Sequence, residues 1–135
     1  TIPEGDRAIL LEIGKWLETN GEAIYGTRPW QIYGEGPTQV VEGSFKDTER
    51  QAFGGDDIRY TRKDDALYAI LLDWPGNEAT LPALGQAAGR LDREISQVTL
   101  LGHNGPLSWR RDADALRVTL PPQRPGDHAY ALKIN

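Results

Sequence analysis

The chain has 135 residues, of which 39% are hydrophobic and 26% charged, and its formal net charge is −5. This length suits one domain with its own core, and Lys and Arg are spread along the chain without the basic stripe that nucleic-acid binding requires. No apolar run approaches the roughly 18 residues of a membrane-spanning helix, and the lack of cysteine excludes disulfides and thiolate metal sites.

The N-terminal residues have neither the basic region nor the apolar region of a signal peptide, and the chain starts with Thr1 in place of Met. We therefore expect a piece of a longer protein, whose cellular compartment the sequence leaves open. No internal repeat or low-complexity tract is present, so a single domain of ordinary size is expected.

The spacing of apolar residues predicts an amphipathic helix over residues 3–20. Pro3 is tolerated in a first turn, where Glu4 and Asp6 also favour the positive end of the helix dipole. One side of this helix is apolar, formed by Ile9, Leu10, Ile13, Trp16 and Leu17. Asn20-Gly21 predicts its end, with Gly21 able to take the left-handed conformation. The apolar side packs either on the chain's own core or against another domain.

After the helix, the pattern changes to short strands. Gly34, Gly36 and Pro37 exclude a helix, and the polar residues 43–57 predict a long loop or an irregular edge strand. Strands are then predicted at 58–62, 67–74, 79–81, 95–101, 107–110, 116–120 and 130–134, with residues 85–93 as a connection. The predicted fold is all-β: an antiparallel two-sheet β-sandwich of about seven to eight strands, preceded by one amphipathic α-helix. Residues 68–72 are apolar on both faces, which predicts a central, covered strand.

The candidate acid–base and metal-binding residues are better explained by local structure. Calcium needs about six to eight oxygens at one place, whereas aspartates in turns more often accept backbone N–H groups. We interpret three acidic pairs in this way: Asp56-Asp57, Asp64-Asp65 and Asp112/Asp114. Glu22 is expected to make a structural hydrogen bond, and His103 and His128 are expected to be solvated imidazoles, since neither has a second ligand at metal-binding spacing. The sequence therefore assigns no catalytic, cofactor-binding or metal-binding residue, and no cofactor.

The aromatic residues are stronger candidates, because exposed Trp and Tyr rings stack on sugars. The possible platform comprises Trp30, Trp74, Trp109, Tyr25, Tyr33 and Tyr60. Large aromatics also dominate protein cores. Trp74 ends an apolar strand and Trp109 alternates with polar neighbours, so core positions are favoured for both.

Residues 20–30 (NGEAIYGTRPW), directly behind residues 11–17 (LEIGKWL), resemble one segment of the retaining α-L-fucosidases of glycoside hydrolase family 29. In that family, this segment joins the last helix of the catalytic barrel to a C-terminal β-sandwich. Further similar strings follow in the same order: residues 57–61, 67–70, 73–75, 100–102, Trp109 and 116–121. The resemblance spans essentially the whole chain.

The resemblance implies that residues 1–30 are the last barrel helix and the interdomain joint, and that residues 31–135 are the C-terminal β-sandwich. Enzymes of this family hydrolyse terminal α-L-fucosyl glycosides with two carboxylates about 5 Å apart. Both carboxylates belong to the (β/α)8 barrel, which needs roughly 250 residues, and no residue here matches the nucleophile motif. The implied role is an accessory domain that supports the barrel and is inactive alone.

The implied partners are the catalytic barrel and, through the parent enzyme, fucosylated glycans; a homo-oligomer is left open, and neither nucleic acid nor membrane is expected. A secreted, periplasmic or lysosomal location is typical of the family. In its barrel geometry, residues 20–30 would lie on the rim far from the sugar pocket, as a structural joint. Two alternatives remain: a carbohydrate-binding module for fucosylated glycans, or a free-standing interaction domain that uses the helix.

Overall fold

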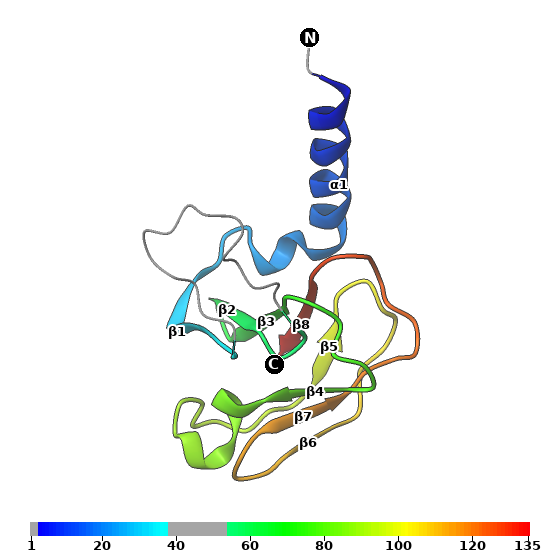
Figure 1. Cartoon of the computed structure of the whole chain (residues 1–135). Coiled ribbons are helices and arrows are strands. Elements are labelled where there is room, and N and C mark those ends of the chain that lie inside the picture. Colours follow the sequence, from blue (N-terminus) through cyan, green and yellow to red (C-terminus); the bar gives the residue numbers. More distant parts are fainter. Residues whose placement is uncertain (1–2, 38–53) are drawn as a thin grey trace.

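The computed structural model describes residues 3–37 and 54–135. In these ranges one α-helix projects from a sandwich of two antiparallel sheets (Figure 1). The elements are α1 (Glu4–Asn20), η1 (Gly21–Ala23), β1 (Arg28–Glu35), β2 (Ile58–Lys63), β3 (Ala66–Leu71), β4 (Glu78–Leu81), η3 (Pro82–Leu84), η4 (Gln86–Ala88), β5 (Val98–Leu100), β6 (Trp109–Arg111), β7 (Leu116–Thr119) and β8 (Tyr130–Ile134). The predicted fold class is confirmed. None of the helices in the described ranges is long and apolar enough to cross a membrane.

The larger sheet has the strand order β1-β2-β3-β8-β5, and the smaller sheet has the order β4-β7-β6. All the strand pairs are antiparallel. The last strand of the chain, β8, lies inside the larger sheet, where Leu132 is paired with Ala69 of β3 on one side and with Leu100 of β5 on the other. The sandwich therefore closes only when the C-terminal strand inserts between segments that precede it.

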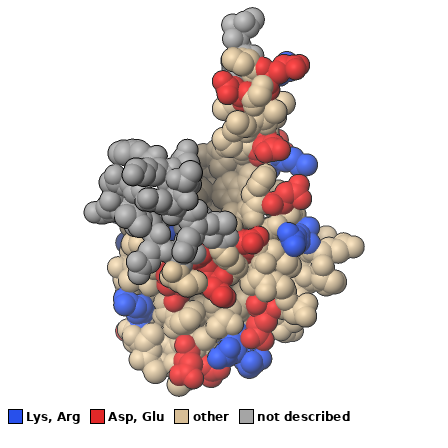
Figure 2. Space-filling model, viewed as in Figure 1, with Lys and Arg blue, Asp and Glu red and all other residues tan. Residues whose placement is uncertain are grey.

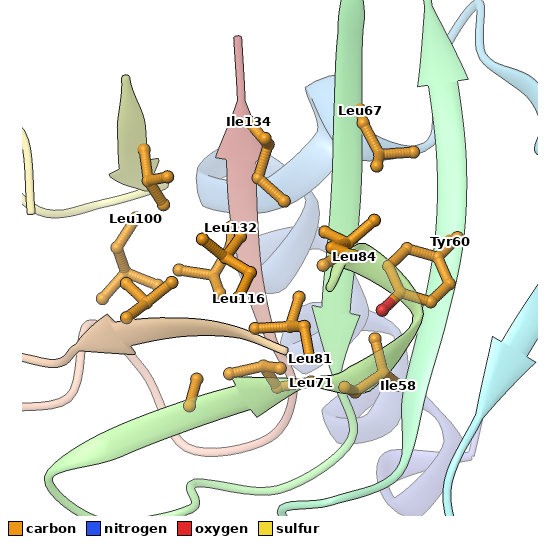
Figure 3. Close-up of a cluster of buried hydrophobic side chains, with 14 of the residues drawn as sticks. Ile58, Tyr60, Leu67, Leu71, Leu81, Leu84, Leu100, Leu116, Leu132 and Ile134 are labelled. Atoms are coloured by element: carbon orange, nitrogen blue, oxygen red, sulfur yellow. The ribbon is translucent and has the colours of Figure 1, made fainter. Parts of the chain in front are cut away.

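The main core lies between the two sheets (Figure 3). In β7, Leu116 and Val118 are buried, whereas Arg117 and Thr119 keep solvent contact, as the alternation of the sequence predicts. Full burial of one Leu or Ile side chain contributes about 1.5–3 kcal/mol. The side chains labelled in Figure 3 come from both sheets and from η3: Ile58, Tyr60, Leu67, Leu71, Leu81, Leu84, Leu100, Leu116, Leu132 and Ile134.

The central strand β3 is buried on both faces, which confirms the prediction for residues 68–72. Its second face belongs to a smaller cluster, made of Ala23, Tyr68, Ile70, Leu101 and Ala131. Trp16 of α1 packs against the same cluster, and Ala23 of η1 has no exposed surface. The end of the helix and η1 therefore cover the face of the larger sheet that the smaller sheet leaves open.

Strand β1 was not predicted, because two features hide its period. It lies at the edge of its sheet, and its pairing with β2 shifts register between Pro29 and Gly34. Gly34 is required by close packing, since a Cβ there would lie 2.4 Å from the carbonyl oxygen of Ile58. β1 begins at Arg28, two positions before the expected domain boundary at residue 30.

The predicted helix end was right in position but wrong in mechanism. Gly21 has φ −59° and ψ −29°, so it is right-handed and leads into η1. A Cβ at Gly21 would lie 2.8 Å from Cε2 of Tyr25, so a larger residue there would displace the Tyr25 ring. The left-handed glycine is Gly26, with φ 67°, at the turn into β1.

Two of the predicted strands were longer than those in the structure. β3 ends at Leu71 rather than at residue 74, and β5 begins at Val98 rather than at residue 95. The connection at 85–93 contains the short helix η4. Most of the predicted loop or edge strand at 43–57 lies outside the described residues.

Candidate functional site

The N-terminal part of α1 projects away from the sandwich (Figure 1), and its apolar side chains are exposed. We call Ile9, Leu10, Ile13, Trp16 and Leu17 the apolar stripe. Ile9 is 57% exposed, Leu10 55% and Ile13 49%, whereas Trp16 and Leu17 are half-buried. The first part of the stripe therefore does not pack on the chain's own core. Grouped apolar side chains of this kind mark an interaction surface.

Among the described residues, the contacts between α1 and the sandwich lie in the C-terminal half of the helix. The indole N–H of Trp16 donates to the carbonyl oxygen of Ala129 at 2.9 Å. Thr19 lies over Gly102, where a Cβ would come within 2.6 Å of Thr19 Cγ2. Gly102 also has φ 88°, so both its conformation and its lack of a side chain permit this contact.

A polar clamp holds η1 against the open face of the larger sheet. The carboxylate of Glu22 accepts a hydrogen bond from the Tyr68 hydroxyl at 2.8 Å and lies 3.0 Å from the Lys133 ammonium. The Thr61 hydroxyl donates to the carbonyl oxygen of Ala23 at 2.6 Å. Three strands thus hold two successive residues, and Glu22 makes the structural hydrogen bond expected of it. We call Glu22, Tyr68 and Lys133 the Glu22 clamp.

The clamp changes the acidity of its members. Burial alone would raise the pKa of Glu22, but the hydrogen bonds from Tyr68 and Lys133 outweigh it and hold that pKa below its ordinary value of 4.5. Burial, together with the Glu22 carboxylate, raises the pKa of Tyr68 to about 12. The clamp is therefore a charged Glu22 held by a protonated Tyr68 over the neutral pH range.

The acidic pairs act in turns, as interpreted from the sequence. Asp57 is fully buried and accepts the Gly54 N–H at 2.8 Å. Asp64 has φ 53° in the turn between β2 and β3. Asp112 accepts the N–H groups of Asp114 and Ala115, both at 2.9 Å.

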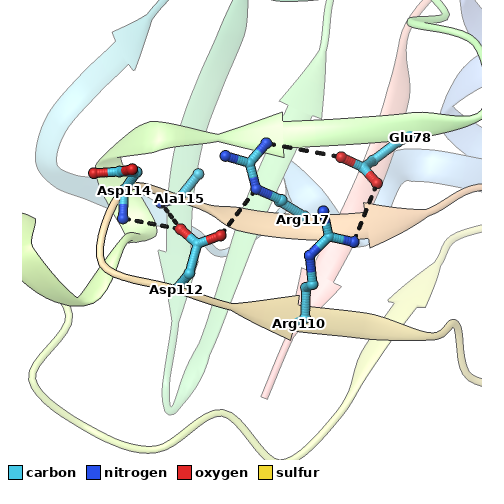
Figure 4. Close-up of polar contacts among 6 residues, drawn as sticks. All are labelled: Glu78, Arg110, Asp112, Asp114, Ala115 and Arg117. Carbon is cyan, nitrogen blue, oxygen red and sulfur yellow. Dashed lines mark hydrogen bonds and ion pairs between the residues drawn. The ribbon is translucent and has the colours of Figure 1, made fainter.

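Asp112 also belongs to an ion-pair network across the smaller sheet (Figure 4). Arg117 lies 3.0 Å from Asp112 and 3.8 Å from Glu78, which also pairs with Arg110 at 3.5 Å. The hydrogen bond from Arg117, with those from Ala115 and Asp114, lowers the pKa of Asp112. These exposed pairs contribute little to stability. On the face shown in Figure 2, acidic and basic side chains are interspersed without a basic stripe.

Both histidines are exposed and lie apart from any ligand set. His103 follows β5, and His128 lies 3.6 Å from Glu12 of α1. Among the described residues, no group of three or more His, Asp or Glu side chains is placed to hold a metal ion.

The aromatic residues do not form one platform. Trp30 packs against Tyr60, and Trp74 packs edge-on against Tyr130, each with ring centroids 4.9 Å apart. Trp109 also packs against the main core. Tyr25 and Tyr33 remain, 60% and 74% exposed, and the Arg59 guanidinium lies over the Tyr33 ring at 5.4 Å.

The family model described as the alpha-L-fucosidase C-terminal domain matches residues 53–135. The chain belongs to this family. Tissue alpha-L-fucosidase of Rattus norvegicus is 33% identical over 133 residues, and that of Homo sapiens is 32% identical over 130 residues; each match covers 93% of this chain. Because each match covers 93% of the chain, it extends N-terminal to residue 53, where the family model begins.

Solved structures agree on the fold. The Thermotoga maritima alpha-fucosidase in complex with fucose has a TM-score of 0.69 and 24% identity, over 100% of this chain and 27% of its own. An alpha-L-fucosidase isoenzyme of Paenibacillus thiaminolyticus has a TM-score of 0.66. The chain spans 23% of the length of the rat and human relatives, so most of each relative lies outside the match.

Three residues of the joint were not found from the sequence. Lys133 and Thr61 lie on strand faces that the alternation predicts to be solvent-exposed. For Tyr68 the sequence predicts a place in a covered strand and no hydrogen-bond partner. Tyr68 and Lys133 contact Glu22, and Thr61 contacts the carbonyl oxygen of Ala23. Both partners are distant in sequence, so only the packing of η1 on the sheet brings these residues together. The signal that could have pointed to them was the unusual covering of both faces of β3.

Proposed function

We propose that this fucosidase C-terminal domain supports the catalytic barrel of an α-L-fucosidase and supplies none of its catalytic carboxylates. The observation that carries this proposal is the exposed part of the apolar stripe. Ile9, Leu10 and Ile13 are each about half exposed, on a helix that is otherwise firmly attached at its C-terminal end. A barrel packed on this helix would bury those side chains and gain about 25 cal/mol per Å² of apolar surface.

The joint supports the same role. Trp16 and the Glu22 clamp fix the last turns of α1 and η1 on the sheet, so the free part of the helix has a set direction. A rigid connection of this kind would hold a barrel in one orientation relative to the sandwich. In the whole protein, the residues nearest Glu4 would lie towards the sugar pocket, and the joint would lie away from it.

The reaction of the whole protein is proposed from the relatives. Hydrolysis of terminal α-L-fucosyl glycosides with retention requires a nucleophile and an acid/base, which we place in the barrel. Two carboxylates of this chain already have structural roles: Asp112 accepts hydrogen bonds in a turn, and Glu22 forms the clamp. Fucosylated glycans would then reach this domain only through the parent enzyme.

The test compares the 135-residue chain with the full-length protein of its native host. We expect the full-length protein to have several times the mass of this chain and to release 4-nitrophenol from the α-L-fucoside, whereas the chain alone releases none. Ile13→Asp in the full-length protein should lower its melting temperature, because the substitution places a charge in the interface. Turnover by the chain alone, or a full-length protein of about the same mass as the chain, would overturn the proposal.

A further inference from the structure

One buried polar atom in the joint has no partner. Asn20, the last residue of α1, is 4% exposed, and its side-chain nitrogen donates to the carbonyl oxygen of Trp16 at 3.3 Å. Its side-chain oxygen, Oδ1, is buried and makes no hydrogen bond within the part of the chain that the structure describes. Native proteins rarely leave such an acceptor unpaired, so this atom indicates a missing donor.

The same side chain lines a cleft between the C-terminal half of α1 and residues 125–128. The cleft has a volume of about 170 Å³, and the residues that line it include Glu12, Lys15, Thr19, Asp127 and His128. One water needs only about 10–15 Å³ by the same kind of measure. The cleft is therefore large enough to admit the end of a side chain.

The cleft adjoins the apolar stripe. Ile9, Ile13, Trp16 and Asn20 follow one another at spacings of four, three and four residues, so they form one line along the helix. Trp16 belongs to the stripe and also lines the cleft. A partner that covers the stripe would therefore also reach the cleft mouth.

We propose that the catalytic barrel inserts an N–H donor into this cleft and pairs it with Asn20 Oδ1. This inference rests on the proposed function, because the donor belongs to the domain that covers the stripe. Solvent water does not reach the oxygen in the present packing, since Oδ1 has almost no exposed surface. The proposed pairing therefore requires a side-chain rearrangement at the cleft when the barrel docks, and rotamer changes of this kind are common at interfaces.

Two isosteric or nearly isosteric substitutions test the pairing in the full-length protein. Asn20→Asp keeps an acceptor oxygen, Asn20→Leu removes it, and both remove the donor to Trp16. If the barrel supplies an N–H donor, the Asp variant of the full-length protein melts at a higher temperature than the Leu variant at pH 7. In the 135-residue chain the order reverses, because a buried carboxylate without a donor is costlier than an apolar group.

The outcomes separate this inference from the proposed function. If Ile13→Asp lowers the melting temperature of the full-length protein but the Leu variant is at least as stable as the Asp variant, the barrel covers the stripe and the donor does not exist. If Ile13→Asp has no effect on the melting temperature, the proposed function fails. A higher melting temperature of the Asp variant than of the Leu variant would then mean that the donor does not come from the barrel, which overturns this inference as well. Where the isolated chain does not fold, the order of the two variants in the full-length protein decides alone.

Discussion

The Glu22 clamp is the contact that most directly connects η1 to the sheet, and Tyr68→Phe tests it by removing a single hydroxyl. The hydroxyl donates to a charged carboxylate at 2.8 Å. A hydrogen bond to a charged group contributes about 1.5–3 kcal/mol. Because the Glu22 side chain is 43% exposed and keeps Lys133 as a partner, solvent screening brings the expected loss of stability below that range, to about 1 kcal/mol at pH 7.

The pH dependence gives the sign of the effect. The folded-state pKa of Glu22 lies below its ordinary value of 4.5, so folding favours the charged form. This contribution is fully present above 4.5 and is lost as the pH falls through the lower, folded-state pKa. The decrease in the free energy of unfolding caused by Tyr68→Phe should therefore be smaller in acid, where the acceptor becomes a neutral carboxyl.

The assay is urea denaturation of the wild-type chain and the variant at pH 7 and in acid, with the midpoint and slope fitted at each pH. Tyr33→Phe is the matched control, since the Tyr33 side chain is 74% exposed and its loss of a hydroxyl should change the free energy of unfolding by less than about 0.5 kcal/mol. Equal losses for the two variants at pH 7 would refute the reasoning, and so would a loss at Tyr68 that does not depend on pH.

Four further predictions follow from the same structure. The pKa of Tyr68, raised to about 12, implies that stability falls as the pH rises from 10 towards 12, a decline that Tyr68→Phe should reduce in alkaline denaturation. Leu132→Ala, at a fully buried position, should cost about 2–5 kcal/mol in the same urea assay; a cost below about 1 kcal/mol would contradict the core described. Gly102→Ala should lower the melting temperature, because the residue has φ 88° and a Cβ would meet Thr19, whereas Gly14→Ala in α1, with open space around it, should raise stability by about 0.5–1 kcal/mol. Ile13→Asp should leave the chain's own stability within about 0.5 kcal/mol, since the side chain is half exposed; unfolding of the chain by this substitution would show that the stripe belongs to its own core.

The predictable part of the fold is the part that local patterns encode. The helix over residues 3–20 follows from the spacing of its apolar residues, β7 follows from strict alternation, and β8 follows from the apolar residues Tyr130, Leu132 and Ile134 at every second position. β1 was missed because an edge position and a register shift remove the period of two. The left-handed glycine was assigned to Gly21, although Gly26 has that conformation, because sequence alone does not tell which of two nearby glycines a ring packs against.

The candidate site was predicted in part. The resemblance in residues 20–30 indicated a joint, and Glu22 was expected to make a structural hydrogen bond there. Its partners Tyr68 and Lys133 lie on separate strands, and nothing in their local sequence shows that either of them contacts Glu22. The unpaired oxygen of Asn20 could not be predicted either, because an unsatisfied atom is defined by everything that surrounds it.

The sequence by itself determined the class of fold, the amphipathic helix and the membership of a fucosidase domain family, because periodicity, turn residues and sequence similarity are properties of neighbouring residues. The tertiary structure alone decided which face of the helix stays open, which strands hold η1, and where an acceptor lacks its donor. Those features depend on contacts between residues far apart in the chain, and such contacts form only when β8 inserts into the sheet and η1 packs on its outer face.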